Sequence, residues 1–161
     1  MVVQFLTKYP TIEEQKNEEA VTLIHCFAKG LQVASLATPP LYLLLALFRK
    51  QPRYMRLLKF SNLVFPPLMT GMGYYKLQAE PDKNKSRAWR LQRNFNQYYL
   101  EDWTMLGLGA GIILGLALPR LGIINMPVLM SSLGTYYGFG MLYGTQYGVL
   151  PKEAFEATNF S

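Results

Sequence analysis

The fold class is decided by residues 121–151, which read LGIINMPVLMSSLGTYYGFGMLYGTQYGVLP and contain 31 consecutive residues without a charge. The hydrocarbon core of a bilayer is about 30 Å thick, and a helix needs roughly 20 predominantly apolar residues to cross it. Two further uncharged runs lie upstream, at residues 31–48 and 104–119. Water-soluble domains seldom tolerate such runs, so the sequence predicts an all-α integral membrane protein.

The apolar runs and the charged segments between them predict four transmembrane helices in a single membrane domain, residues 1–161. We expect the spans at about residues 30–48, 57–75, 103–118 and 126–150. The connection at residues 76–102 and the two short tails are polar. Lys and Arg occur on both faces of this arrangement, so the positive-inside rule leaves the orientation open.

Both early spans carry the tripeptide Pro-Pro-Leu, at residues 39–41 and 66–68. Each proline pair removes two backbone donors and should kink its helix. Membrane helices tolerate this when neighbouring helices satisfy the freed carbonyls.

The polar connection contains an amphipathic, cationic pattern. Ala88, Leu91, Phe95 and Tyr98 recur at spacings of three and four, which predicts an interfacial helix along the membrane surface. Its basic residues are candidates for contact with a partner protein or with anionic headgroups such as those of cardiolipin. These candidates are Lys83, Lys85, Arg87, Arg90 and Arg93. Bound phospholipid is the only non-protein component that we expect, and no cofactor is predicted.

Small residues at regular spacing in the last two spans predict a helix-packing seam, because glycines let helix backbones approach closely. The alternative is the ordinary glycine enrichment of membrane helices. The candidates are Gly107, Gly111, Gly115, Gly134, Gly138, Gly140, Gly144 and Gly148. A dinucleotide fingerprint would need a preceding strand and a βαβ unit, so the glycines of residues 107–111 do not predict one.

No catalytic or metal site is predicted. His25 and the single cysteine, Cys26, are adjacent, so on a helix they point about 100° apart and cannot chelate one ion. We expect both to be ordinary surface or packing residues, with the sole histidine far from any partner. Only Lys59 lies within an expected span, which argues against a pump or a charge-coupled transporter.

The net charge of +6 resides in the segments between the apolar runs, which is where membrane proteins keep basic residues. A nucleic-acid-binding protein is therefore not predicted, and neither is a small-molecule substrate. Residues 1–19 lack the pattern of a cleavable presequence, because glutamates crowd them. Any targeting information is expected to be internal.

Residues 86–115 read SRAWRLQRNFNQYYLEDWTMLGLGAGIILG. This stretch resembles a family of small fungal multi-span membrane proteins that includes the NUXM-type accessory subunit of mitochondrial respiratory complex I (NADH:ubiquinone oxidoreductase). The residues that carry the resemblance are Arg87, Arg90, Leu91, Asn94, Gln97 and Asp102. The polar N-terminus with Tyr9-Pro10 is also similar.

The resemblance implies a non-catalytic subunit in the mitochondrial inner membrane that supports assembly and stability of the membrane arm. Its partners would be other membrane subunits of a large respiratory assembly and anionic lipids, while electron transfer and proton pumping would belong to other chains. Two alternatives stay open. One is a glycine-rich four-span protein related to the inner-membrane translocase channel family, and the other is an assembly or supercomplex factor that binds transiently.

Overall fold

The computed structural model describes residues 17–48 and 53–146, and these form helices almost throughout. The α-helices are α2 (Glu18–Leu47), α3 (Tyr54–Ala79), α4 (Asn84–Arg93), α5 (Phe95–Ala117) and α6 (Asn125–Gln146), with 3-10 turns at Pro81–Lys83 and Pro119–Leu121. The described ranges contain no strand, which confirms the prediction of an all-α chain.

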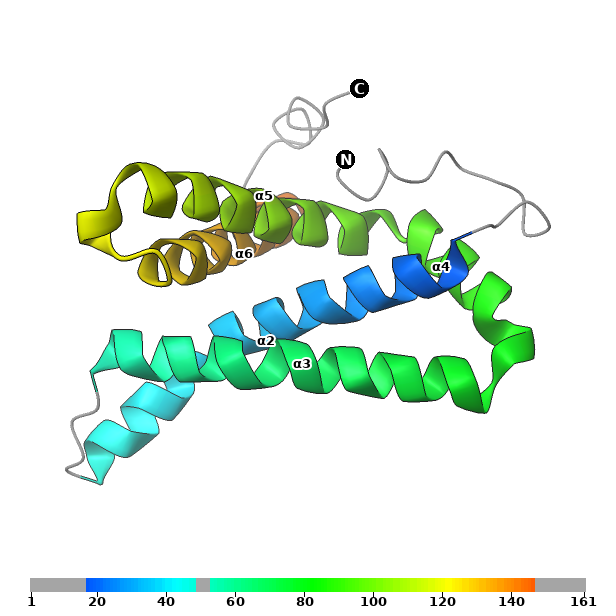
Figure 1. Cartoon of the computed structure of the whole chain (residues 1–161), viewed down its shortest axis with the longest axis horizontal. Helices are drawn as coiled ribbons and strands as arrows, with labels where there is room; N and C mark the ends of the chain where they lie inside the picture. The colour runs from blue at the N-terminus through cyan, green and yellow to red at the C-terminus, as the bar shows by residue number, and fades with distance from the viewer. Residues whose placement is uncertain (1–16, 49–52, 147–161) are drawn as a thin grey trace.

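The helices form two hairpins, one of α2 with α3 and one of α5 with α6 (Figure 1). Helix α4 closes the end at which the first hairpin passes into the second. Helix α2 contacts all four of the other α-helices, so it is the element through which the hairpins are joined. The turn of the second hairpin is tight because Gly122 adopts a φ of 92°, a conformation that favours glycine.

Two helical segments among the described residues are long and apolar enough to cross a bilayer, Glu18–Leu47 and Tyr99–Ala117. Helices α3 and α6 are also long enough, but prolines, amides and hydroxyls lower their hydropathy. Helix length and composition therefore indicate membrane association, and they do not support four crossings. Helices α2 and α5 extend past the N-terminal bounds of the expected spans 30–48 and 103–118, since they begin at Glu18 and Phe95 and include polar residues ahead of each apolar run.

The predicted interfacial helix is interrupted, so Ala88 and Leu91 lie on α4 whereas Phe95 and Tyr98 lie on α5. The break falls at Asn94, whose side-chain oxygen accepts from the backbone N–H of Gln97 at 3.4 Å and caps α5. Ala88 is fully buried, and α4 packs on α2. The single amphipathic helix expected from the spacing was therefore wrong, because a capping asparagine starts a new helix in its middle.

Neither proline pair ends its helix. Pro39 has no backbone N–H with which to bond the carbonyl of Ser35, four residues earlier. The hydroxyl of Tyr136 on α6 donates to that carbonyl oxygen at 2.5 Å. The acceptor that the proline leaves free is thus satisfied by a neighbouring helix.

Candidate functional site

Backbone contact between α5 and α6 occurs at glycines. A Cβ atom added to these glycines would lie 2.1 Å from Met130 O at Gly107, 2.5 Å from Pro127 Cα at Gly111 and 2.1 Å from Trp103 O at Gly134. No side chain fits at such distances from backbone atoms, so each of these three positions requires glycine for the helices to approach this closely.

The other glycines proposed for the seam differ in their surroundings. A Cβ at Gly115 would lie 3.1 Å from the Ile123 carbonyl oxygen, and one at Gly138 would lie 3.0 Å from a methyl of Leu100. Gly140 has open space where a Cβ would stand. Gly144 is half-buried in the last turn of α6, and Gly148 lies outside the described residues.

The first hairpin has close glycine contacts that the sequence analysis did not single out. A Cβ at Gly30 would lie 2.3 Å from Pro66 Cα, and one at Gly73 would lie 2.5 Å from the sulfur of Cys26. Isolated glycines give no repeat at four-residue spacing, and that repeat was the signal used for the second hairpin.

The two hairpins are joined by a contact between a histidine and a buried glutamate. The Nδ1 atom of His25 on α2 lies 2.6 Å from Oε1 of Glu101 on α5, and the Glu101 side chain is only 4% exposed. The ammonium of Lys29 stands 4.0 Å from the same oxygen. Gln97 places its amide nitrogen 2.8 Å from the His25 Nε2 atom. Because a carboxylate only accepts, Nδ1–H donates to Glu101, and Nε2 is left to accept from Gln97.

This pair contradicts two expectations from the sequence. His25 is not isolated, and ionisable groups do lie within an apolar helix, since the candidate span Tyr99–Ala117 contains Glu101. The overlooked signal lies on α2, where polar residues recur at spacings of three and four along one face. They are Thr22, His25, Lys29, Gln32, Ser35 and Thr38.

The polar contacts continue along α2. The amide of Gln32 donates to the hydroxyl of Thr104 at 3.4 Å, and the Thr104 and Thr135 hydroxyl oxygens lie 3.0 Å apart. A second link joins the hydroxyls of Ser35 and Ser132 at 3.0 Å. Side-chain hydrogen bonds of this kind hold helices together where lipid offers no partner.

We call this set of residues the polar seam. It comprises His25, Lys29, Gln32 and Ser35 of α2 with Gln97, Glu101, Thr104, Ser132 and Thr135 of α5 and α6. Hydrogen bonds between polar side chains thus join one hairpin to the other, whereas glycines allow the two helices within each hairpin to pack closely. No group of three or more metal-ligating side chains gathers anywhere in the described ranges.

Two of the basic residues proposed for lipid contact are engaged within the chain. Arg87 forms an ion pair with Glu80 and donates to the Lys76 carbonyl at 3.2 Å, and the Lys83 ammonium lies 3.3 Å from Glu80. The hydrogen bond and charge of Lys83, with the charge of Arg87, hold the pKa of the Glu80 carboxyl below its ordinary value. These contacts close the corner between α3 and α4.

The remaining basic candidates lie on α4. Lys85 and Arg90 are exposed, and Arg90 bonds the Ser86 carbonyl through Nε at 3.3 Å. Arg93 is the last residue of the helix. Lys85 is thus a cation without a role in the corner, which makes it a suitable reference position for charge removal.

The residues that carry the family resemblance gather where the first hairpin passes into the second. Arg87 fastens the corner, Asn94 caps α5, and Gln97 bonds the ring of His25. Their local roles are therefore structural. No protein-family model matches the chain, and no curated protein sequence matches it either.

Proposed function

We propose that this chain is a non-catalytic structural subunit of the membrane arm of mitochondrial respiratory complex I, with several helices crossing the inner membrane. The observation that supports a membrane location is the outward face of both hairpins. Large apolar side chains there are more than half exposed, among them Leu43, Leu47, Phe60, Leu63, Ile113, Leu116 and Leu133. An apolar surface of this extent is expected against lipid or partner helices.

Four crossings form part of the proposal, although α3 and α6 are less apolar than the other long helices. Several polar residues of α6 are turned inward, since Ser131, Ser132 and Thr135 are at most 4% exposed. Their hydroxyls therefore lower the hydropathy of α6 without facing lipid. Because α6 packs along α5 and α3 packs along α2, a membrane crossed by α2 and α5 would also enclose their partners.

A structural role accounts for the buried charges. The Lys29 ammonium lies near Glu101 and opposes its negative charge, His25 donates to the Glu101 carboxylate, and Gln97 donates to the other imidazole nitrogen. Each of these groups is thereby used to join α2 to α5. The assignment to complex I rests on the resemblance of residues 86–115, and the fastening of the hairpins by the polar seam supports a packing role within such an assembly.

Native electrophoresis of a mild detergent extract tests the assignment. We expect the tagged chain to migrate with fully assembled complex I and to resist extraction with alkaline carbonate. Migration with a protein translocase, or only with a partial assembly, would favour one of the two alternatives instead.

A deletion strain tests the non-catalytic role. We expect less assembled complex I, whereas NADH oxidation with artificial acceptors persists per assembled enzyme, because no chemical step is lost. A normal amount of complex without that activity would contradict the proposal.

A further inference from the structure

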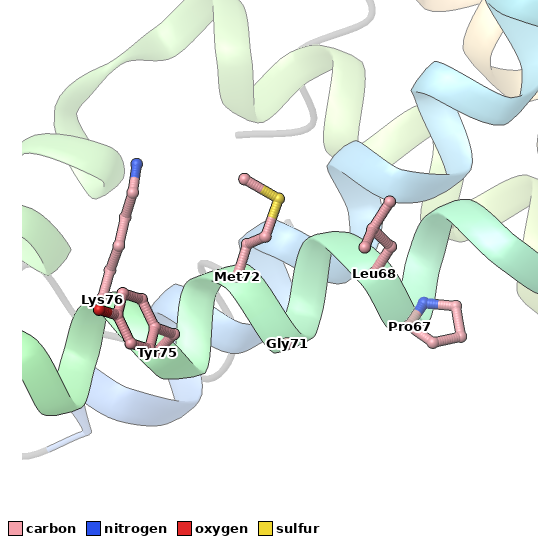
Figure 2. Close-up of a pocket in the computed structure, with 6 residues that line it drawn as sticks. All are labelled: Pro67, Leu68, Gly71, Met72, Tyr75 and Lys76. Atoms are coloured by element: carbon pink, nitrogen blue, oxygen red, sulfur yellow. The ribbon is translucent and has the colours of Figure 1, made fainter.

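An open groove runs along one side of α3. It has a volume of about 550 Å³ and is lined by Pro67, Leu68, Gly71, Met72, Tyr75 and Lys76 (Figure 2). From Leu68 to Lys76 the chain advances about 12 Å along the helix axis. Leu68, Met72 and Lys76 project from the same side of α3 (Figure 2). The groove is therefore an apolar strip with an ammonium group at one end.

Gly71 forms the floor of the groove. Nothing lies within 4 Å of the position that its Cβ would occupy, in contrast to Gly73 two residues later, which packs against Cys26. Leu68, Met72 and Tyr75 around it are each more than half exposed. This part of α3 is consequently an exposed apolar surface that no other described segment covers, and it lies beside the contact with α2.

The charge of Lys76 is not compensated within the described part of the chain. Glu80, the acidic residue one turn further along, pairs with Lys83 and Arg87, and no described carboxylate forms an ion pair with Lys76. A partner that fills the groove must therefore bring both an apolar segment and a negative charge. A transmembrane polypeptide seldom offers that combination, because acids within spans are costly. A phospholipid with an anionic headgroup offers both.

We propose that this groove binds an anionic phospholipid, with an acyl chain over Gly71 between Leu68 and Tyr75 and the headgroup phosphate on Lys76. The inference rests on the membrane location within the proposed function. It assigns lipid binding to α3, whereas the sequence pattern pointed to α4. Tyr74 and Tyr75, next to the lysine, suit the aromatic belt at which headgroups begin.

Native mass spectrometry of the full-length chain tests this proposal. The chain is reconstituted in nanodiscs of equal phosphatidylglycerol and phosphatidylcholine, re-extracted in mild detergent, and its retained lipids are counted. We expect the wild type to retain phosphatidylglycerol preferentially. Lys76→Gln should lower the ratio of retained phosphatidylglycerol to phosphatidylcholine about fivefold, because one basic residue near the headgroups accounts for about that factor. Lys85→Gln, which removes an exposed charge elsewhere, should change the ratio less than twofold.

A second pair of variants tests the groove itself. Gly71→Leu fills the groove and should reduce retention of both lipids. Gly109→Leu adds the same side chain where α5 also has open space, and it should leave retention unchanged. Helicity and elution volume should match the wild type for both variants, because neither Cβ meets another atom within 4 Å.

Three results would overturn the inference while the chain stays resistant to carbonate, and the proposed function would then survive. These results are equal retention of the two lipids by the wild type, equal effects of Lys76→Gln and Lys85→Gln, and loss of a protein partner from the native assembly of Gly71→Leu at unchanged lipid content. Release of the chain by carbonate would instead remove the membrane location, and with it both proposals.

Discussion

The His25 Nδ1 and Glu101 Oε1 atoms lie 2.6 Å apart although the two residues are 76 positions apart in the sequence. This contact joins α2 of the first hairpin to α5 of the second. Because Glu101 is almost fully buried, removing either partner would leave the other with an unsatisfied polar group in an apolar environment. The pair is therefore where a small chemical change should most affect the docking of the hairpins.

Glu101→Leu should destabilise the folded chain by about 1–2 kcal/mol, as the loss of interhelical hydrogen bonds does in membrane helices. Glu101→Gln should lose less, because its amide oxygen still accepts from His25 Nδ1–H. Helicity measured during titration with a denaturing detergent reports the stability. Asp82→Asn, at an exposed carboxyl of the α3–α4 corner, is the control. Equal stability of Glu101→Leu and the wild type would show that the pair does not fasten the hairpins.

Gly134→Leu should separate α5 from α6, because its Cβ would lie 2.1 Å from the Trp103 carbonyl oxygen. Overpacking of this kind costs about 1–3 kcal/mol. The amount of chain in the native assembly measures the effect. Gly140→Leu is the matched control on the same helix, since its Cβ would stand in open space. If the two variants assembled equally well, the close approach at Gly134 would have no part in assembly.

Tyr136→Phe should cost about 1 kcal/mol, because it removes the donor to the Ser35 carbonyl. That carbonyl lacks an intrahelical donor because Pro39 has no N–H. Pro39→Ala restores the donor, so Tyr136→Phe should cost less in a Pro39→Ala background. A double-mutant cycle by detergent denaturation measures this coupling. Additive losses would mean that the hydroxyl and the proline act independently.

Arg87→Gln should loosen the corner between α3 and α4, because Arg87 joins Glu80 to the Lys76 carbonyl. Hydrogen exchange of the α4 amides should become several-fold faster, whereas Lys85→Gln should leave it unchanged. The pKa of Glu80 is depressed, so its contacts persist at neutral pH and are lost as the pH falls through that lowered value. The protection of these amides in the wild type, corrected for the intrinsic exchange rate at each pH, should fall over the same interval. If the protection of the α4 amides depended neither on Arg87 nor on pH, the ion pair between Arg87 and Glu80 would not be what holds α4 against the end of α3.

Four crossings predict the sidedness of three connections. The C-terminal end of α2, the start of α3 and the connection between α5 and α6 lie at one end of the molecule, and α4 lies at the other (Figure 1). In a Cys26→Ser background, Arg53→Cys and Arg120→Cys should react with an impermeant maleimide from one face of the membrane. Lys83→Cys should react only from the opposite face. Labelling of Arg53→Cys and Lys83→Cys from the same face would show that α3 does not cross.

The sequence by itself determined the helical character of the chain, and its glycine spacing pointed to a set of positions of which Gly107, Gly111 and Gly134 lie at close contacts between α5 and α6. Both follow from local chemistry. Long uncharged runs leave the helix as the backbone conformation that satisfies its own hydrogen bonds in lipid, and glycines four residues apart share one helix face. Gly107 and Gly111 could therefore be assigned to a common face without knowledge of the neighbouring helix.

Only the tertiary structure decided which residues meet across the hairpins. Glu101 precedes its apolar run, so composition placed it in a polar connection. The cap at Asn94 starts α5 early enough to turn this carboxylate onto α2, against His25. Gly30 is likewise required only because Pro66 of α3 packs against it, and the sequence does not reveal that contact. Helix periodicity fixes which residues share a face, but the facing partner depends on where each helix begins and on how the hairpins dock.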